Sequence, residues 1–154
     1  LARLIDELER AHGVRIDLEN MFPLRRGRFR WSSYTPDHDP TTPGARWYTL
    51  DLSHTATAGD DALALLDRMG ERLVHLHLAD GTGLERDEHL VPGRGGQPCA
   101  EVCRRLGAAG FDGTVVVEIS TRRARSRNER LDALAESLLF ARLHLGTDLP
   151  RSPV

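Results

Sequence analysis

Residues 72–95 constrain the fold of this chain more than any other stretch, because a strand pattern there leads directly into a polar loop. Aliphatic residues alternate with His75 and His77, and side chains that alternate with period two lie on opposite faces of a strand. The glycine-rich segment that follows carries Asp87 and His89, an Asp-x-His pair of metal-ligand character. The stretch therefore predicts a strand with a histidine face that leads to a metal-binding loop. A pair of hydrogen-bonded core histidines is the alternative.

The rest of the chain alternates strand patterns with helix patterns. Strands are expected near residues 14–21, 47–54, 72–80 and 113–120. Helices are expected over residues 1–12, 59–69, 97–109 and 126–145. Such alternation is typical of an α/β fold in which parallel strands are joined by right-handed helical crossovers. We expect the last helix to turn four leucines inward: Leu131, Leu134, Leu138 and Leu139.

Residues 22–46 fit neither pattern, and their prolines predict a long irregular loop. Loops of this length inside one domain are usually functional or mobile. The loop carries a basic cluster formed by Arg25, Arg26, Arg28 and Arg30. This cluster could contact a phosphate group, or it could be a solvated basic surface.

Composition narrows the class of protein. The chain has 154 residues, enough for one packed domain, with 40% hydrophobic and 29% charged residues. The formal net charge of -2 argues against binding to nucleic acid through overall charge. No apolar run approaches the roughly 18 residues of a membrane span, and Cys99 and Cys103 do not resemble a disulfide framework. We therefore expect a cytoplasmic protein with no membrane partner.

Each expected strand ends in an ionisable side chain. The four residues are Glu19, Asp51, His77 and Glu118. Because the C-terminal ends of parallel strands meet at one edge of a sheet, we expect these side chains to converge. Three carboxylates and an imidazole would repel one another or be desolvated there without a cation. Mostly oxygen ligands with one nitrogen suit a divalent metal, namely Mn²⁺, Mg²⁺, Co²⁺ or Zn²⁺.

The chain resembles a known family in four segments: LEN, LDLSH, HLHLADG with DEHLVPGRG, and VVVEIS. Together they are similar to the xylose isomerase-like TIM-barrel superfamily, which includes sugar phosphate isomerases and epimerases and the type-IV AP endonucleases. The resemblance covers residues 13–145 and corresponds to the second half of the family's barrel. It implies that residues 1–154 are the C-terminal half of a single TIM (β/α)8 barrel domain. The chain also begins inside a helix pattern, so we expect it to be part of a longer protein.

The resemblance implies roles for the strand-end residues. In ketose epimerases, the metal ligands match Glu19, Asp51, His77 and Glu118. The carboxylates that match Glu19 and Glu118 also act as the acid/base pair. His75 is not expected to be a ligand, because the family's ligand is the histidine nearest the loop.

Other residues depart from the epimerase pattern. His54 would orient a substrate oxygen in an epimerase. Asp87 and His89, with His54, instead match the third-zinc ligands of the AP endonucleases. These three residues are therefore candidates for a second metal or for the substrate. Arg94 of the PGRG segment is a candidate contact for substrate or phosphate.

Three functions are compatible with these residues. The first is a metal-dependent sugar or sugar phosphate isomerase or epimerase, which acts on a small carbohydrate by enediolate-type proton transfer. The second is a zinc-dependent endonuclease IV-like phosphodiesterase, which the net charge disfavours. The third is a truncated, inactive metal-binding half-barrel. A half-barrel leaves two edge strands unpaired, so we expect this chain to form a homo-oligomer.

Overall fold

The computed structural model describes residues 1–26, 28–35, 37–84 and 86–146. Its main sheet has four parallel strands in the order β1-β4-β5-β6. These strands are β1 (Asp17–Glu19), β4 (Trp47–Asp51), β5 (Leu73–Leu78) and β6 (Thr114–Val117). The strand order follows the chain and never reverses, which distinguishes a segment of a (β/α) barrel from a doubly wound sheet. The predicted α/β fold with four parallel strands is confirmed.

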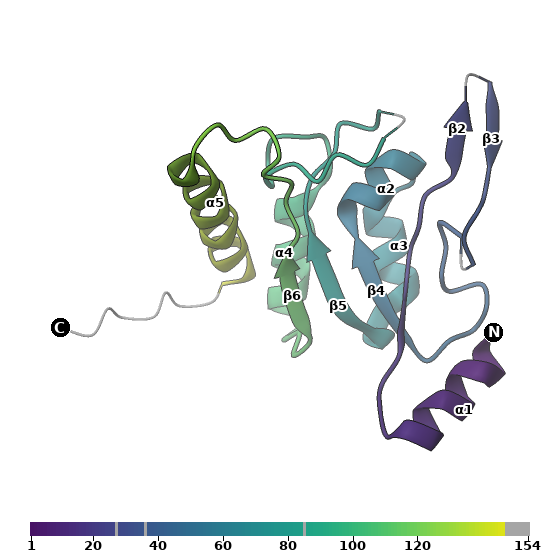
Figure 1. Ribbon diagram of the computed structural model, residues 1–154. Helices are drawn as coiled ribbons and strands as arrows, with labels where there is room; N and C mark the ends of the chain where they lie inside the picture. Colours follow the sequence, from purple (N-terminus) through teal and green to yellow (C-terminus); the bar gives the residue numbers. More distant parts are fainter. Residues whose placement is uncertain (27, 36, 85, 147–154) are drawn as a thin grey trace.

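Helices precede β1, connect β4 to β5 and β5 to β6, and follow β6. They are α1 (Ala2–His12), α2 (Leu52–Ala58), α3 (Ala62–Met69), α4 (Cys99–Ala108) and α5 (Arg127–Leu145), with a short 3₁₀ helix, η1 (Gly70–Arg72). Figure 1 shows α3 and α4 against one face of the sheet, whereas α1 and α5 lie at opposite ends of it. Within the described ranges, no helix combines the length and the apolar character needed to cross a membrane.

The helix-facing side of the sheet forms the core. Its most buried strand residues are Tyr48, Leu50, Leu76 and Leu78. Parallel pairing places Leu50 beside Leu76 and, on the opposite face, Asp51 beside His77. The alternation in the sequence predicted this division, because odd-numbered and even-numbered residues of β4 and β5 point to different sides. The site side chains therefore lie on the face away from α3 and α4.

All four strands are shorter than expected. β4 ends at Asp51 instead of continuing to residue 54, because the Asp51 carboxylate accepts a hydrogen bond from the backbone N–H of His54 at 2.7 Å. Asp51 thus caps α2, and His54 is helical rather than extended. The other three strands span residues 17–19, 73–78 and 114–117 of the expected ranges.

The segment 22–46 is not wholly irregular. β2 (Leu24–Arg26) and β3 (Phe29–Trp31) form an antiparallel hairpin that is separate from the main sheet. Basic and apolar residues alternate over residues 28–31, a strand signal that the surrounding prolines obscured. Arg28 stacks over an aromatic ring, with its guanidinium carbon 5.3 Å from the ring centroid. The other side chains of the predicted basic cluster lie outside the described residues: Arg25, Arg26 and Arg30.

The expectation that α5 buries its leucines is wrong. Their exposed fractions range from 39% to 54% in Leu131, Leu134, Leu138 and Leu139. α5 packs against α4 and β6, and its buried residues are Ser137 and Ala141. Gly107 of α4 allows this close approach, because a Cβ atom there would lie 2.3 Å from the backbone oxygen of Leu145. The leucines consequently face away from the sheet that this chain provides.

Candidate metal centre

The four predicted ligands lie at the C-terminal edge of the main sheet. Glu19 and Asp51 end β1 and β4, His77 is the next-to-last residue of β5, and Glu118 directly follows β6. The backbone N–H of Glu118 donates to the carbonyl oxygen of Leu78 at 3.2 Å, which continues the pairing of β6 with β5 up to this edge. Residues far apart in the sequence thus reach one place, as parallel strand ends require.

His77 is the centre of this cluster. Its Nδ1 atom lies 2.9 Å from Oε2 of Glu118 and 3.1 Å from Oε1 of Glu19. The same atom lies 3.4 Å from Oδ2 of Asp51. Ligand atoms of Glu19, Asp51 and His77 all lie within 4.8 Å of one another. Carboxylates from three different strands therefore surround one imidazole nitrogen.

The cluster fits a divalent cation in its bonding and in its charge. Asp51 is fully buried, and its Oδ2 accepts no hydrogen bond from the part of the chain that the structure describes. This oxygen has the long 3.4 Å ion pair with His77 in place of a hydrogen bond, and a buried carboxylate oxygen so placed would gain from a closer cation such as a metal ion. The carboxylates of Asp51 and Glu19 raise the pKa of His77 to about 10. The imidazole therefore carries the positive charge that the carboxylates require, which is the charge a metal ion would bring.

His54 adds a second imidazole to this environment. Its Nδ1 atom lies 2.9 Å from the carbonyl oxygen of Asn20 and 3.2 Å from Oε1 of Glu19. Burial lowers the pKa of His54, but the Asp87 and Glu19 carboxylates outweigh burial and raise this pKa to about 11. Burial alone would raise the pKa of Glu19, whereas hydrogen bonds with His54 and His77 lower it to about 2. Glu19 is therefore ionised over the physiological pH range.

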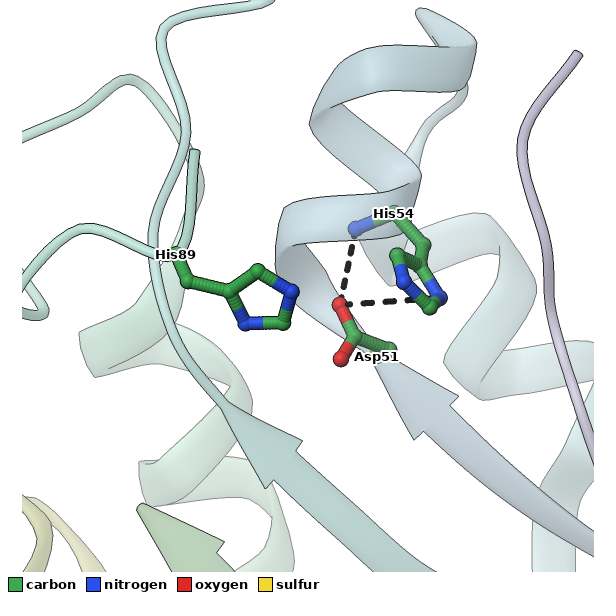
Figure 2. Close-up of side chains that lie close together, drawn as sticks. All are labelled: Asp51, His54 and His89. Carbon is green, nitrogen blue, oxygen red and sulfur yellow. Dashed lines mark hydrogen bonds and ion pairs between the residues drawn. The ribbon is translucent and has the colours of Figure 1, made fainter. Parts of the chain in front are cut away.

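A second cluster, formed by His54, Asp87 and His89, adjoins the first. Oδ2 of Asp87 lies 2.6 Å from Nε2 of His89 and 3.5 Å from Nε2 of His54. Figure 2 shows His54 and His89 on either side of Asp51, with His54 on a helix and His89 on a loop. Ligand atoms of Asp51, His54 and His89 lie within 4.8 Å of one another. The two predicted sets of residues therefore meet at Asp51.

The charges of the second cluster follow from the same contacts. Burial would raise the pKa of Asp87, but hydrogen bonds with His54, His89 and Ser53 lower it. The Asp87 carboxylate in turn raises the pKa of His89 to about 9. In this arrangement the cluster is an ionised carboxylate held between two cationic imidazoles. Neutral imidazoles would be needed for His54 or His89 to bind a metal.

His89 has a strained backbone, with a φ of 48° that non-glycine residues seldom adopt. Its N–H donates to Oγ of Ser53 at 3.0 Å, and its Nδ1 atom lies 2.8 Å from the carbonyl oxygen of Glu118. These contacts fix the His89 imidazole between Asp87 and the residue that follows β6. Strain of this kind concentrates at functional sites, where the surrounding structure maintains it.

Two buried polar residues that the sequence analysis missed support both clusters. Asn20 accepts the backbone N–H of Asp51 at 2.7 Å and donates to the Asp51 carbonyl oxygen at 3.0 Å. Ser53 donates from its hydroxyl to Oδ1 of Asp87 at 2.5 Å. Each residue adjoins a predicted site residue in the sequence, Asn20 after Glu19 and Ser53 before His54. That adjacency is the signal that could have identified them.

Asp80 organises the loop that carries the second cluster. Its carboxylate is fully buried and accepts four backbone N–H groups, those of Gly81, Gly93, Gly95 and Gln97. A Cβ atom on Gly95 would lie 2.3 Å from Oδ1 of Asp80, so only glycine permits this approach. The glycine-rich sequence therefore serves to wrap backbone around one carboxylate.

Two further predicted residues make other contacts. His75 lies on the same face as His77 but two residues earlier, with its Nδ1 atom 3.6 Å from Oδ2 of Asp17. The guanidinium of Arg94 donates to both carboxylate oxygens of Glu136 on α5, at 3.2 Å and 2.5 Å. Arg94 is therefore engaged by α5, and a phosphate at Arg94 would compete with this pair.

Comparison with known proteins places the fold in a family. The sequence pattern of the xylose isomerase-like TIM barrel family matches residues 1–143. The chain is also similar to the crystal structure of a D-tagatose 3-epimerase-like protein, with a TM-score of 0.61 and 22% identity. That likeness covers 92% of this chain and 53% of the solved chain. At this level of identity it shows the fold alone.

Curated relatives extend the comparison. An uncharacterised protein of Mycobacterium tuberculosis is 53% identical over 157 residues, which cover 90% of this chain and 56% of that protein. An uncharacterised protein of Mycobacterium leprae is 50% identical over 160 residues, with coverages of 92% and 57%. The fructoselysine 3-epimerase of Escherichia coli O157:H7 is 30% identical over 80 residues, which cover 51% of this chain and 29% of the epimerase. The chain thus spans about half the length of the mycobacterial relatives.

Proposed function

Because this chain belongs to the xylose isomerase-like TIM-barrel family, we propose that it is the C-terminal half of the barrel of a metal-dependent sugar or sugar phosphate isomerase or epimerase. The partial similarity to a fructoselysine epimerase supports this class. The observation that carries the proposal is the position of Glu19 and Glu118, which approach the same His77 nitrogen, at 3.1 Å and 2.9 Å, from strands at opposite edges of the sheet. Proton transfer to and from carbon needs two such groups around one substrate.

The metal would be held by Glu19, Asp51, His77 and Glu118. When bound, a divalent ion supplies Lewis-acid polarisation of substrate oxygens, which makes the neighbouring C–H bond more acidic. His77 would have to lose its proton to serve as a ligand. Asp51 would use the buried oxygen that lacks a hydrogen-bond donor among the described residues.

Glu19 and Glu118 would share the proton transfer. One carboxylate takes a proton from carbon and the other returns a proton, so that the configuration or the position of the carbonyl changes. Glu118 is the more accessible of the two, with 45% of its side chain exposed, and it lines a hollow of about 440 Å³. A sugar in this hollow would lie next to Glu118 and within the reach of His89. We therefore assign to Glu118 the closer contact with substrate.

Solvent exchange tests the acid/base assignment. In D₂O with Mg²⁺, the full-length enzyme that contains this chain should exchange a carbon-bound proton of a ketose substrate for deuterium, as measured by proton NMR. Glu19→Gln and Glu118→Gln should each abolish the exchange, even when the metal is saturating. His75→Ala, the matched control on the same face of β5, should retain it. Exchange that persists in either glutamine variant would remove that residue from the acid/base pair and leave it as a ligand only.

A second candidate function rests on the cluster of His54, Asp87 and His89. These residues match metal ligands of endonuclease IV-like phosphodiesterases, and Oδ2 of Asp87 lies within 3.5 Å of both imidazoles. A metal count by mass spectrometry separates the two functions. A single ion per chain favours the isomerase or epimerase. Several zinc ions per chain, together with cleavage of DNA at an abasic site, would favour the phosphodiesterase.

A further inference from the structure

Arginines border the candidate metal centre on its open side. Two adjoining hollows, of about 440 Å³ and 280 Å³, share the lining residues Asp87, Glu88, Ser120 and Arg122. The larger is also lined by Glu118 and His89, and the smaller by Arg86 and Arg123. The two hollows therefore form one depression with an acidic end at the metal centre and a basic end outside it.

The backbone holds Arg122 and Arg123 at this depression. The N–H of Ser120 donates to the carbonyl oxygen of His89 at 2.7 Å, which ties the segment after β6 to the loop of the second cluster. The N–H of Ala124 donates to the carbonyl oxygen three residues earlier at 3.1 Å and closes a turn. Arg122 and Arg123 occupy the two central positions of that turn. The side chains of Arg122 and Arg123 therefore extend from a backbone segment that hydrogen bonds hold in place.

Two carboxylates also line the basic end, and both already accept hydrogen bonds from other residues: Asp87 and Glu88. Within the described ranges, Arg122 and Arg123 form no ion pair shorter than 4 Å, although Arg123 interacts electrostatically with Glu88, and Arg86 reaches Glu88 at 3.8 Å. Glu88 also accepts hydrogen bonds from the backbone N–H and the hydroxyl of Thr82, at 2.8 Å and 2.5 Å. Three guanidinium groups thus face two carboxylates that other residues already bind, and the resulting excess of positive charge attracts an anion.

We propose that Arg86, Arg122 and Arg123 form a phosphate subsite, and that the substrate is a phosphorylated sugar. The carbohydrate part of this inference rests on the proposed function, whereas the phosphate part rests on the arginines. A guanidinium fork binds two phosphate oxygens at once, and a phosphate monoester carries a charge of about -1.5 to -2 at neutral pH. The sugar would lie with its hydroxyl groups toward Glu118 and its phosphate at the basic end.

Titration with inorganic phosphate, followed by NMR in the absence of metal, tests the subsite apart from turnover. Arg122→Ala/Arg123→Ala should weaken phosphate binding about tenfold or more. The matched control, Arg127→Ala/Arg130→Ala, removes the same charge from exposed positions at the start of α5 and should change binding less than about twofold. Equal weakening in both double variants, or no phosphate binding by the unsubstituted protein, would overturn the subsite.

A lysine double variant tests whether weaker phosphate binding in the alanine variant is due to loss of folding. Arg122→Lys/Arg123→Lys keeps both charges but removes the bidentate forks, so its phosphate affinity should lie between those of the unsubstituted protein and the alanine variant. An affinity equal to that of the unsubstituted protein would contradict bidentate recognition. Circular dichroism of all three variants should match that of the unsubstituted protein, because the substituted side chains are exposed.

A pair of sugars separates this inference from the proposed function. Fructose 6-phosphate should bind about tenfold more tightly than fructose, and the difference should vanish in Arg122→Ala/Arg123→Ala. Arginine-dependent phosphate binding by a protein without metal affinity would sustain the subsite and contradict the proposed function. Metal binding with equal affinity for both sugars would overturn the subsite alone. Duplex DNA that displaces phosphate and depends on all four substituted arginines would also overturn it, in favour of the phosphodiesterase.

Discussion

The interior strands of the main sheet and its edge strands differ in how completely this chain buries them. On β4 and β5, Leu50 and Leu76 are fully buried. At one edge, Val116 of β6 is 37% exposed, and Leu138 of the neighbouring α5 is 51% exposed. β4 and β5 have strand partners on both sides, whereas β1 and β6 each have one in this sheet. The chain thus completes its centre and leaves apolar flanks, as four strands of a closed barrel would.

The candidate metal centre divides in the same way. Asp51 and His77 come from the interior strands and are the less exposed members of the set. Glu19 and Glu118 come from the edges and are the more exposed. The interior strands would therefore supply metal ligands in fixed positions, and the edge strands the carboxylates that we assign to proton transfer. This division is what the following predictions test.

Truncation of leucine side chains should show the largest difference between centre and flank. Leu76→Ala removes a fully buried side chain and should lower the free energy of unfolding by about 2–5 kcal/mol. Leu138→Ala makes the same chemical change on the exposed side of α5 and should cost less than about 0.5 kcal/mol in a monomer. Urea denaturation of both variants measures this. Similar losses would show that α5 packs its leucines against something in solution.

Metal affinity should depend on pH through the interior histidine. The pKa of His77 is raised from 6.5 to about 10, so the metal-free protein holds a proton there at neutral pH, and the metal-bound form does not. Apparent affinity should therefore rise about tenfold per pH unit between pH 6 and 8. Calorimetry in two buffers of different ionisation enthalpy would count the released protons. An affinity that is constant over this range would contradict a ligand role for His77.

Substitutions at the exposed flank should have the smallest effect, which we expect on self-association of the chain. We expect the isolated chain to sediment as a dimer or larger species, because its edges and α5 expose apolar surface. Leu138→Gln/Leu139→Gln should weaken this association about tenfold, whereas Leu84→Gln, an equally exposed leucine on a loop, should not. A monomer with a sharp, concentration-independent thermal transition would show that four strands are self-sufficient. If that monomer also failed to bind metal, neither the proposed function nor a metal-binding half-barrel would stand.

The features that could be predicted from the sequence are those that depend on local residue patterns. Period-two alternation identified the faces of β4 and β5, and the position of acids at strand ends indicated which side chains converge. The end of β4 could also have been predicted, because Asp51 is a typical N-cap residue for a helix that starts at Leu52. The alternation of apolar residues, which continues to Leu52, favoured a longer strand instead. Local pattern thus located the candidate site better than it located the strand boundaries.

Other features depend on contacts that no local pattern contains. The leucines of α5 have helical spacing, and their exposure follows from what packs beside the helix. The strained backbone of His89 and the pairing of Arg94 with Glu136 also arise from distant segments that meet only in the fold. Such features require the structure.

Calorimetric titration with Mn²⁺ tests the central claim most directly, namely that the strand-end residues bind a divalent metal. The unsubstituted chain should bind the ion, and His77→Ala and Glu118→Gln should each weaken binding about a hundredfold. His75→Ala is the matched control, because His75 lies on the same strand and face and also adjoins a carboxylate, that of Asp17. It should change the affinity less than about threefold. Unchanged affinity in both His77→Ala and Glu118→Gln would contradict a metal centre shared by these residues.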